Sequence, residues 1–313
     1  MVATKLAESA KFQDPDVTAN GEVRASVALR SLETLWLNTG TLCNLECANC
    51  YIESSPRNDR LAYLNCAEAE DYFNEIATER LGTRQVGITG GEPFMNPQII
   101  EILEAALGRG LEVLVLTNAM KPMAYRKKKL LGLREKYGRQ LSLRVSLDHF
   151  TKEGHELERG PSSWQPALDG LKWLSAKGFS LSVAGRIFAS KDQLLLRHRY
   201  AELFATENIG VDAYNPAALT LFPSMDTAID VPEVTAGCWD QLGVRPEDQM
   251  CASSRMVVKR RGAQKPVIMP CTLLPYDPQF EMGSRLSEST GSVKLNHPYC
   301  AQFCVLGGSN CGP

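Results

Sequence analysis

The sequence predicts an α/β protein: a partial (β/α)6 TIM-like barrel followed by a small cysteine-rich β-hairpin extension. Three observations predict this fold. Short apolar runs alternate with amphipathic stretches over most of the chain, ten cysteines fall into two groups, and no cysteine occurs between Cys66 and Cys238. Repeating βα units imply a parallel sheet with helices outside it. In such barrels the chemistry lies at the C-terminal ends of the strands.

The strands are expected where short apolar runs are bounded by Gly, Asn or Asp. These runs are Leu35–Leu37, Gln85–Thr89, Glu112–Thr117, Leu141–Leu147 and Leu181–Phe188. Helices are expected where apolar residues recur every three or four positions, as in Ile99–Leu107 and Trp164–Leu174. Ser162 and Ser163 are candidate caps for the second helix, and Gly178 is its expected end. The basic run Arg126–Lys129, in a helix expected over 123–139, is interpreted as a solvated face.

The pattern changes after about residue 236. Met256–Lys259 and Pro266–Met269 read as two short strands around the turn Arg260–Lys265, which predicts a β-hairpin between Cys251 and Cys271. We therefore expect an N-terminal extension over 1–32, the partial barrel over 33–235, and a cysteine-rich domain over 236–313.

Composition and charge exclude several classes of function. The 313 residues are 44% hydrophobic and 22% charged, with a formal net charge of −2. That balance gives no electrostatic reason to expect binding to nucleic acid or to an anionic membrane. No apolar run reaches the roughly 20 residues that span a bilayer, and the first thirty residues lack the apolar core of a signal peptide. The sequence predicts a cytoplasmic protein.

The cysteines indicate metal ligation, because a reducing compartment disfavours structural disulfides. Only four histidines are present, so a metal site should be rich in thiolates, which favour iron–sulfur clusters or zinc. Cys43, Cys47 and Cys50 have the spacing C-x3-C-x2-C directly after the first strand. Three such thiolates can hold three irons of a [4Fe–4S] cluster and leave the fourth iron open to a small molecule. The spacing is also compatible with a zinc site that has a remote fourth ligand.

A second motif follows the next strand, which runs directly into Gly90-Gly91-Glu92-Pro93. The glycines allow a sharp bend and a close approach of the backbone to a ligand, and Pro93 restrains the exit from the turn. Such a turn can present carbonyls and the Glu92 carboxylate to an amino group. Taken alone, it is equally compatible with an ordinary βα connection.

The two motifs together, each after its own strand, resemble the radical S-adenosylmethionine (SAM) superfamily over residues 33–215. The resemblance implies a [4Fe–4S] cluster whose open iron binds the amine and carboxylate of SAM. It also implies reductive cleavage of SAM to a 5′-deoxyadenosyl radical, which abstracts hydrogen from a substrate, with an electron donor such as flavodoxin or ferredoxin. In such enzymes the cofactor performs the difficult chemistry, and the protein orients and shields it.

The resemblance also implies cofactor-binding residues in this sequence, whereas it names no residue for a catalytic role, and the catalytic residues stay unknown. Gly90, Gly91 and Glu92 would contact the methionyl amine, and Pro93 is a further cofactor-binding candidate. Thr117 and Asn118, at the end of the third strand, would face the cofactor. Ser146 and Asp148 would contact the ribose, and Arg159 the carboxylate, with Arg186 as an alternative. A surface ion pair with Glu156 or Glu158 is the other interpretation of Arg159. Many members have an aromatic residue before the third cysteine, which packs near the adenine. Here Asn49 takes that position, and Tyr51, directly after the cysteine, is the candidate for this contact with the cofactor.

The C-terminal cysteines resemble the ligands of the auxiliary-cluster extensions called twitch and SPASM. The resemblance implies one second [4Fe–4S] cluster held by a subset of Cys251, Cys271, Cys300, Cys304 and Cys311. Cys238 is either a further ligand or a buried thiol, and Cys66 is expected to be structural.

A small metabolite is the substrate that we expect from the sequence. Peptide maturases of this superfamily usually carry an N-terminal leader-binding domain, whereas about thirty residues precede the first strand here. A peptide-modifying maturase is the alternative within the superfamily. A non-catalytic protein that binds zinc or a cluster is the alternative from another class.

Overall fold

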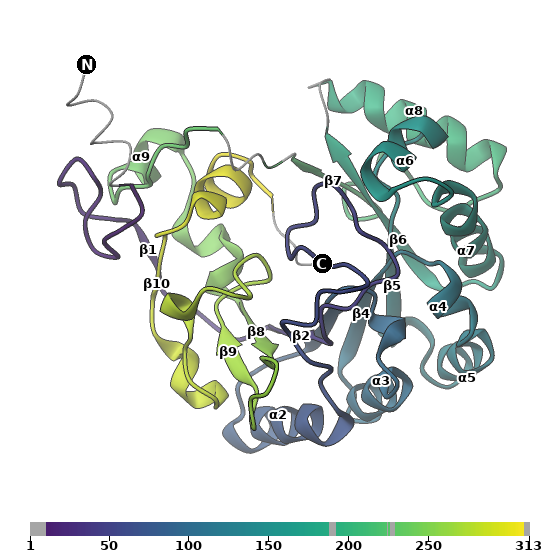
Figure 1. The fold of residues 1–313 in the computed structure, drawn as a ribbon, viewed down its shortest axis with the longest axis horizontal. Helices are drawn as coiled ribbons and strands as arrows, with labels where there is room; N and C mark the ends of the chain where they lie inside the picture. Colours follow the sequence, from purple (N-terminus) through teal and green to yellow (C-terminus); the bar gives the residue numbers. More distant parts are fainter. Residues whose placement is uncertain (1–10, 188–191, 224, 226–228, 310–313) are drawn as a thin grey trace.

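The computed structural model describes residues 11–187, 192–223, 225 and 229–309 (Figure 1). An eight-stranded sheet forms the centre, in the order β7-β6-β5-β4-β3-β2-β8-β9. Its six barrel strands are parallel: β2 (Thr34–Asn38), β3 (Gln85–Thr89), β4 (Glu112–Thr117), β5 (Leu141–Ser146), β6 (Ser180–Ile187) and β7 (Leu219–Pro223). The predicted α/β fold with a six-stranded parallel barrel is confirmed. Phe188, the last residue of the predicted fifth strand, lies outside the described residues.

Helices lie along the outer face of this sheet (Figure 1). They are α2 (Cys66–Glu79), α3 (Ile99–Leu107), α4 (Lys121–Ala124), α5 (Lys127–Tyr137), α6 (Lys152–Arg159), α7 (Trp164–Ala176) and α8 (Gln193–Thr206), and the short α9 (Cys238–Leu242) belongs to the C-terminal region. Within the described ranges no helix is both long and apolar enough to cross a membrane.

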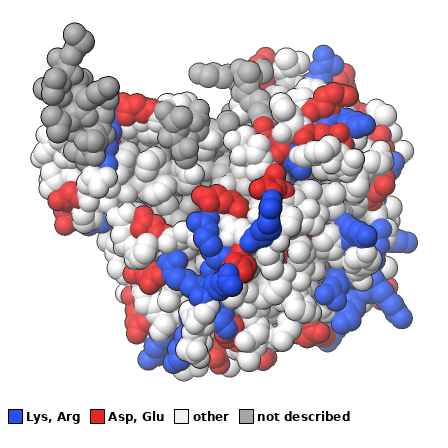
Figure 2. Space-filling model, in the orientation of Figure 1, with Lys and Arg blue, Asp and Glu red and all other residues white. Residues whose placement is uncertain are grey.

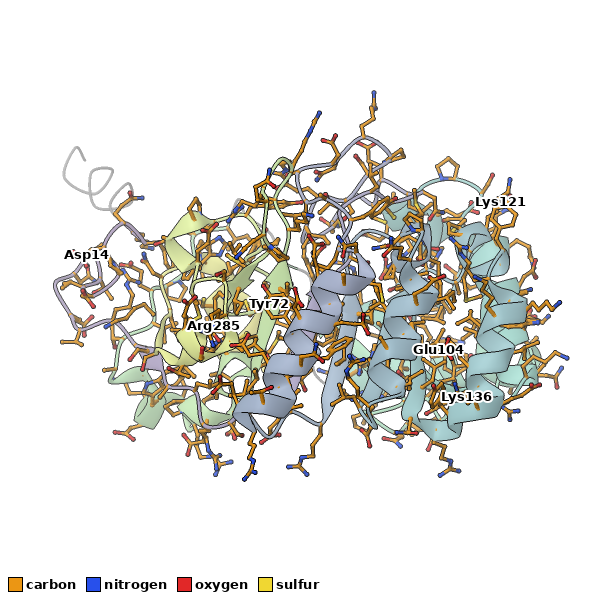
Figure 3. All side chains as sticks on the ribbon, turned by 90° about the horizontal axis from the view of Figure 1, so that it is seen from below. Asp14, Tyr72, Glu104, Lys121, Lys136 and Arg285 are labelled. Carbon is orange, nitrogen blue, oxygen red and sulfur yellow. The ribbon has the colours of Figure 1, made fainter. Side chains whose placement is uncertain are left out.

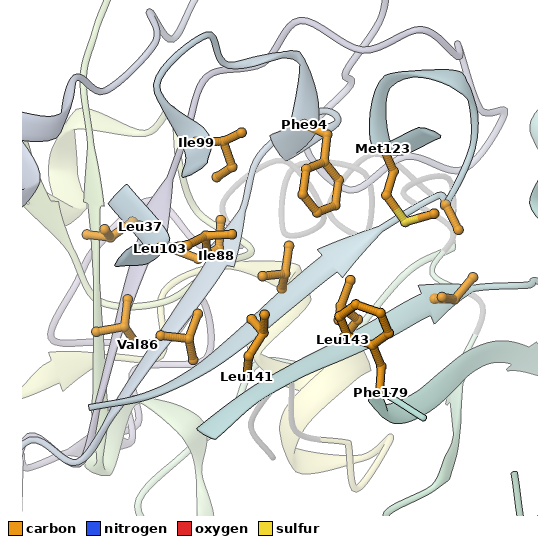
Figure 4. Packing of buried hydrophobic residues seen from close by; sticks show 14 of the residues in the cluster. Leu37, Val86, Ile88, Phe94, Ile99, Leu103, Met123, Leu141, Leu143 and Phe179 are labelled. Carbon is orange, nitrogen blue, oxygen red and sulfur yellow. The ribbon is translucent and has the colours of Figure 1, made fainter. Parts of the chain in front are cut away.

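Strand side chains alternate between two hydrophobic layers, because successive residues of a strand point to opposite faces. Leu35 and Leu37 of β2 pack outward with the helices, and Trp36 packs inward with the C-terminal region. The outer layer also holds the apolar faces of α3 and α7, which confirms both predicted helices. Figure 4 shows part of this layer, with side chains from the strands, from α3 and from the turn after β3.

Two local expectations differ from the structure. The helix expected over 123–139 is divided into α4 and α5, with Arg126 as the residue before α5, and the basic run lies at the start of α5. Figure 2 shows basic side chains gathered over α5, and Lys129 faces Glu101 at 3.8 Å. The hydroxyl of Ser163 does not cap α7, because it donates to the Gly160 carbonyl at 2.7 Å.

The predicted C-terminal hairpin is confirmed: β8 (Ser254–Val258) pairs antiparallel with β9 (Val267–Met269). It does not stand apart from the barrel, because β8 also pairs in parallel with β2. All five residues of β8 are buried, so this strand needs a partner on each side. The hairpin therefore continues the barrel sheet beyond its first strand.

The N-terminal segment packs on the C-terminal region. β1 (Ser26–Val27) pairs antiparallel with β10 (Val293–Lys294). The guanidinium of Arg24, buried beside β1, forms an ion pair with Glu233 at 2.5 Å. The C-terminal region also contacts α2, as Figure 3 shows for Tyr72 and Arg285; the Tyr72 hydroxyl donates to the Ser284 carbonyl at 3.1 Å. These contacts join the two ends of the described chain to the barrel.

Gly87 of β3 has no side chain, and the Trp36 ring of the neighbouring strand β2 packs against its backbone in the space that a side chain would fill. A Cβ atom on Gly87 would overlap the ring carbons of Trp36. We expect Gly87→Ala to lower the free energy of unfolding by about 1–3 kcal/mol, the usual effect of overpacking. Gly132→Ala, in the interior of α5 with open space around it, is the matched control and should be stabilising by about 0.5–1 kcal/mol. Urea unfolding of both variants measures the contrast, and equal effects would contradict this packing.

Candidate functional site

A cavity with an empty volume of about 1090 Å³, including its open mouth, lies at the C-terminal ends of the barrel strands. This is the end where the chemistry was expected. Most predicted site residues line it: Cys43, Cys47, Cys50, Tyr51, Gly90, Gly91, Thr117, Asn118, Ser146, Asp148, Arg159 and Arg186. The structure therefore brings together residues from the loops and ends of five strands.

The three cysteines of the first motif lie on the loop after β2, and backbone amides already point at two of the sulfurs. Leu45 N–H donates to Cys43 Sγ at 3.4 Å, and Ser54 N–H donates to Cys50 Sγ at 3.3 Å. The side-chain amide of Asn118 approaches Cys43 Sγ at 3.9 Å. Burial raises the pKa of Cys43 to about 12, so this thiol ionises at neutral pH only beside a cation.

The described residues contain no group of three His, Cys, Asp or Glu side chains arranged to hold one metal ion. A [4Fe–4S] cluster differs from a single ion, because each of its thiolates binds a separate iron at a corner of the cluster. The arrangement that matters for a cluster is three sulfurs around a common cavity, and Cys43, Cys47 and Cys50 have it.

The glycines of the second motif are required by the backbone of the cysteine loop. Gly90 has a φ of +137°, and a Cβ atom there would lie 2.5 Å from the Gly40 carbonyl oxygen. A Cβ atom on Gly91 would overlap the Leu42 carbonyl. Gly91 N–H donates to that Gly40 oxygen at 2.8 Å, so the two loops are held in direct backbone contact. Side chains at these positions would push the cysteine loop away from the strand ends.

Glu92 and Pro93 lie behind the wall of the cavity and are not among its described lining residues. The buried Glu92 carboxylate accepts hydrogen bonds from the Thr117 hydroxyl at 2.9 Å and from the backbone amides of Asn118, at 2.8 Å, and Phe94, at 3.1 Å. Burial raises its pKa from 4.5 to about 7, against the effect of these hydrogen bonds. The carboxylate thus braces the turn against the end of β4.

Asp148 is shared by two arginines. Its Oδ2 lies 2.7 Å from Arg159 Nε, and its Oδ1 lies 3.4 Å from Arg186 Nε. The interpretation of Arg159 as a surface ion pair with Glu156 or Glu158 is wrong, because its partner is the buried Asp148. Burial raises the pKa of Asp148, but the charges of Arg159 and Arg186 outweigh burial and hold the pKa below the ordinary value. The group therefore places positive charge beside the cysteine loop.

Arg186 and Tyr51 connect the cysteine loop to the rest of the site, a role that the sequence analysis missed. Arg186 Nη2 donates to the Asn49 carbonyl at 2.8 Å, and its guanidinium lies 4.7 Å from the centre of the Tyr51 ring. The Tyr51 hydroxyl donates to the Pro223 carbonyl at 3.1 Å. The sequence analysis also missed Arg144 of β5, which lines the cavity; a signal was present, because Arg144 and Ser146 alternate with apolar residues along that strand.

The C-terminal cysteines gather in the second hydrophobic cluster. Cys251 and Cys300 are buried in it, and Cys238, Cys271 and Cys304 pack against it. Burial raises the pKa of Cys251 to about 11 and that of Cys300 to about 12. Cys300 and Cys304 share a short π-helix, η7 (Cys300–Val305), and Cys311 lies outside the described residues.

This cysteine group borders the cavity. Thr272 and Leu273, which follow Cys271 directly, line the cavity wall. Phe303, between Cys300 and Cys304, contacts the Tyr51 ring edge-on with centroids 5.7 Å apart. Cys238, which packs against the same cluster, accepts a hydrogen bond at Sγ from Thr235 N–H at 3.4 Å. Cys66 lies apart from this group, at the start of α2 against the outer core. The two groups of cysteines are thus neighbours in space.

Comparison with known proteins agrees with this geometry. The family model described as the radical SAM superfamily matches residues 37–191. Those residues form a radical SAM domain. They contain all three cysteines of the first motif, the glycine turn, and the Asp148, Arg159 and Arg186 group. The cavity is completed from outside the matched residues by Phe222 of β7, Thr272 and Leu273.

Curated relatives match part of the chain. The antilisterial bacteriocin subtilosin biosynthesis protein AlbA of Bacillus subtilis is 32% identical over 147 residues, which are 47% of this chain and 31% of that protein. The mycofactocin maturase MftC of Mycobacterium ulcerans is 29% identical over 138 residues, 44% of this chain and 35% of that protein. The chain thus spans about a third of the length of these relatives.

Solved structures match the fold over a larger share of the chain. Streptococcus suis SuiB bound to S-adenosylmethionine superposes with a TM-score of 0.58 and 14% identity, over 81% of this chain and 63% of SuiB. The structure of anSMEcpe with bound AdoMet gives a TM-score of 0.58 and 13% identity, over 85% of this chain and 81% of that chain. At these identities the likeness concerns the fold alone.

A radical SAM domain uses a [4Fe–4S] cluster and SAM, and the residues of this cavity fit both groups. Three thiols face a common space, and backbone amides are already directed at two of them. Hydrogen bonds to cluster sulfurs are a normal feature of such sites. The Arg159 guanidinium donates from Nε and Nη2 to Asp148 and supplies positive charge that suits a carboxylate at the cavity.

The raised pKa of Glu92 makes stability depend on pH. A folded-state pKa above the unfolded value favours folding when the carboxyl is protonated. That contribution is complete below about pH 4.5 and is lost as the pH rises through about 7. Relative to Glu92→Gln, the metal-free wild-type chain should lose on the order of 3 kcal/mol of unfolding free energy between pH 5 and 8. Urea titrations across that range measure the difference. A constant difference would mean that the hydrogen bonds keep Glu92 ionised throughout.

Proposed function

We propose that this chain is a radical SAM enzyme in which Cys43, Cys47 and Cys50 hold the SAM-binding cluster. The observation that carries the proposal is the convergence of these three sulfurs on one cavity beside an arginine–carboxylate group. When bound, the cluster and SAM supply a 5′-deoxyadenosyl radical for hydrogen abstraction from a substrate. Flavodoxin or ferredoxin is the proposed class of electron donor.

The protein's own residues bind and orient SAM. Arg159 pairs with the SAM carboxylate, and Asp148 fixes the direction of its guanidinium by holding Nε. The backbone of Gly90 and Gly91 contacts the methionyl amine, while Glu92 holds that turn in place from behind. Ser146 and Asp148 provide ribose contacts, and Tyr51 is the aromatic side chain available to the adenine.

A second [4Fe–4S] cluster is proposed for the C-terminal cysteine group. Cys251, Cys271, Cys300 and Cys304 share one hydrophobic cluster, and Cys311 is a further candidate ligand. Two of the thiols have strongly raised pKa values, which oppose ionisation without a metal. The group borders the cavity through Thr272 and Leu273, close enough to accept an electron from the substrate or to bind it.

We propose two substrate classes, with a small metabolite as the first candidate. The relatives favour a peptide, because AlbA is a bacteriocin biosynthesis protein, MftC is a maturase, and a structure of SuiB is described as bound to precursor peptide SuiA. We take the peptide as the second candidate.

The first cysteine motif should be essential for SAM cleavage. Anaerobically reconstituted protein, given dithionite and SAM, should release 5′-deoxyadenosine, measured by chromatography. Cys43→Ala, Cys47→Ala and Cys50→Ala combined should abolish the release, because no thiolate remains to hold the cluster beside SAM. Cys66→Ala is the matched control and should retain it, since that thiol lies at the start of α2, outside the cavity lining. Full release from the triple variant would refute the proposal.

Deuterium transfer separates the two substrate classes. Extract from the source organism grown in deuterated medium is added to the enzyme with unlabelled SAM. Deuterium should then appear in 5′-deoxyadenosine by mass spectrometry, because the radical takes its hydrogen from the labelled substrate. Protease digestion of the extract should remove the labelling if the substrate is a peptide and leave it intact if the substrate is a small metabolite. An extract that never transfers deuterium would argue against hydrogen abstraction from either class.

A further inference from the structure

Arg255 is a fully buried arginine of β8 whose hydrogen bonds all go to backbone carbonyls. Its Nε donates to Ser289 O at 2.8 Å, and its Nη1 donates to Cys251 O at 2.6 Å and Ser254 O at 2.7 Å. Its Nη2 donates to Gly291 O at 3.2 Å. In the part of the chain that the structure describes, no carboxylate lies within ion-pair distance of this guanidinium.

Two other buried arginines, Arg24 and Arg186, have a carboxylate partner. Arg24 pairs with Glu233 at 2.5 Å, and Arg186 shares Asp148 with Arg159. Taking a charge out of water is costly, and proteins normally offset the cost with an opposite charge at close range. The carbonyls around Arg255 satisfy its N–H groups and carry no net charge. A buried cation of this kind indicates that a nearby group becomes anionic in the functional protein.

The nearby groups that can become anionic are cysteine thiols. Arg255 Nη1 donates to the Cys251 carbonyl at 2.6 Å, which places the guanidinium next to that cysteine. Cys251 and Cys300 are buried in one hydrophobic cluster, and Cys271 packs against the same cluster. Metal ligation deprotonates a thiol outright. The missing counter-charge of Arg255 would therefore appear when the C-terminal cysteines bind iron.

We propose that Arg255 is the positioning residue and charge partner of the second cluster, an inference that rests on the proposed function. A [4Fe–4S] cluster held by thiolates carries net negative charge, and reduction adds to it. A buried guanidinium beside the thiolates stabilises the reduced state more than the oxidised state and so raises the reduction potential. Arg255 thereby favours electron acceptance by a cluster at the cavity wall. Its bonds to the Cys251 and Ser289 carbonyls hold it in place.

A purely structural role makes a different prediction. Three of these hydrogen bonds join β8 to the segments at Cys251 and at Ser289–Gly291, so a purely structural Arg255 would act only as a link between loops. Such a link would affect folding in the absence of iron and would leave the potential of an assembled cluster unchanged. If Arg255 acts through its charge, removing the charge changes the reduction potential of the cluster. Lysine should largely preserve that potential, because it keeps the charge although it loses the planar fork.

The test uses the full chain with Cys43, Cys47 and Cys50 replaced by alanine, so that only the C-terminal cluster contributes. Arg255→Gln and Arg255→Lys are made in this parent and reconstituted anaerobically with iron and sulfide. Arg197→Gln is the matched control. Arg197 lies on α8 of the barrel and also donates to two backbone carbonyls, those of Ala213 and Leu219. Iron per chain and the midpoint potential, from an EPR-monitored redox titration, are measured for each protein.

We expect Arg255→Gln to bind less iron and to shift the midpoint potential of the remaining cluster to more negative values. Arg255→Lys should stay near the parent in both measurements, and Arg197→Gln should match the parent. An unchanged potential in a loaded Arg255→Gln protein would overturn the proposal. A folded Arg255→Lys protein that binds no iron would also overturn it, because the charge alone would then be insufficient.

The remaining outcomes are equally decisive. If the parent protein, which lacks Cys43, Cys47 and Cys50, folds and binds no iron, the second cluster does not form. The proposal for Arg255 would then be overturned as well. Circular dichroism of the metal-free variants reports on folding. If Arg255→Gln does not fold, the lysine variant decides: a loaded lysine variant with the parental potential supports the charge role. Loss of folding in both variants would identify a structural link and overturn the proposal.

Discussion

The site depends on one close backbone contact, between the glycine turn after β3 and the cysteine loop after β2. Gly91 N–H donates to the Gly40 carbonyl, and neither Gly90 nor Gly91 has room for a side chain. Glu92 fixes the other side of the turn by accepting hydrogen bonds at the end of β4. Three consecutive strands are thereby tied together at their C-terminal ends, and the three thiols are held over the mouth of the barrel. The motif is as much a support for the cysteine loop as a surface for a ligand.

The two cysteine groups differ in where the neighbouring arginine side chains lie. At the first group, Arg159 and Arg186 share Asp148 and face an open cavity, so their charge is available to a bound anion. At the second group, Arg255 is enclosed among carbonyls next to buried thiols. The first arrangement suits a small molecule that enters and leaves. The second arrangement suits a permanent group with fixed ligands. The contact between the Tyr51 and Phe303 rings joins the cysteine loop to the C-terminal cysteine group.

Local signals in the sequence predicted five of the six barrel strands, the two loops that carry the motifs and the C-terminal hairpin; they did not locate β7. The interactions that they could not predict join residues far apart in the chain. Sequence proximity suggested Glu156 or Glu158 as the partner of Arg159, whereas the strand end places Asp148 there. The pairing of β8 with β2 and the burial of Glu92 depend likewise on how the sheet closes. Periodicity describes which face of an element is buried, and it carries no information about which distant element covers that face.

The central claim is that the cysteine loop leaves one iron of its cluster open to SAM. Electron–nuclear double resonance on the reduced, reconstituted protein with SAM labelled isotopically at the methionyl nitrogen tests it most directly. The account predicts a hyperfine coupling between the cluster and that nitrogen, retained when Cys251 and Cys300 are replaced by alanine in a chain that still folds. A reduced cluster that shows no coupling to bound, labelled SAM would contradict the account.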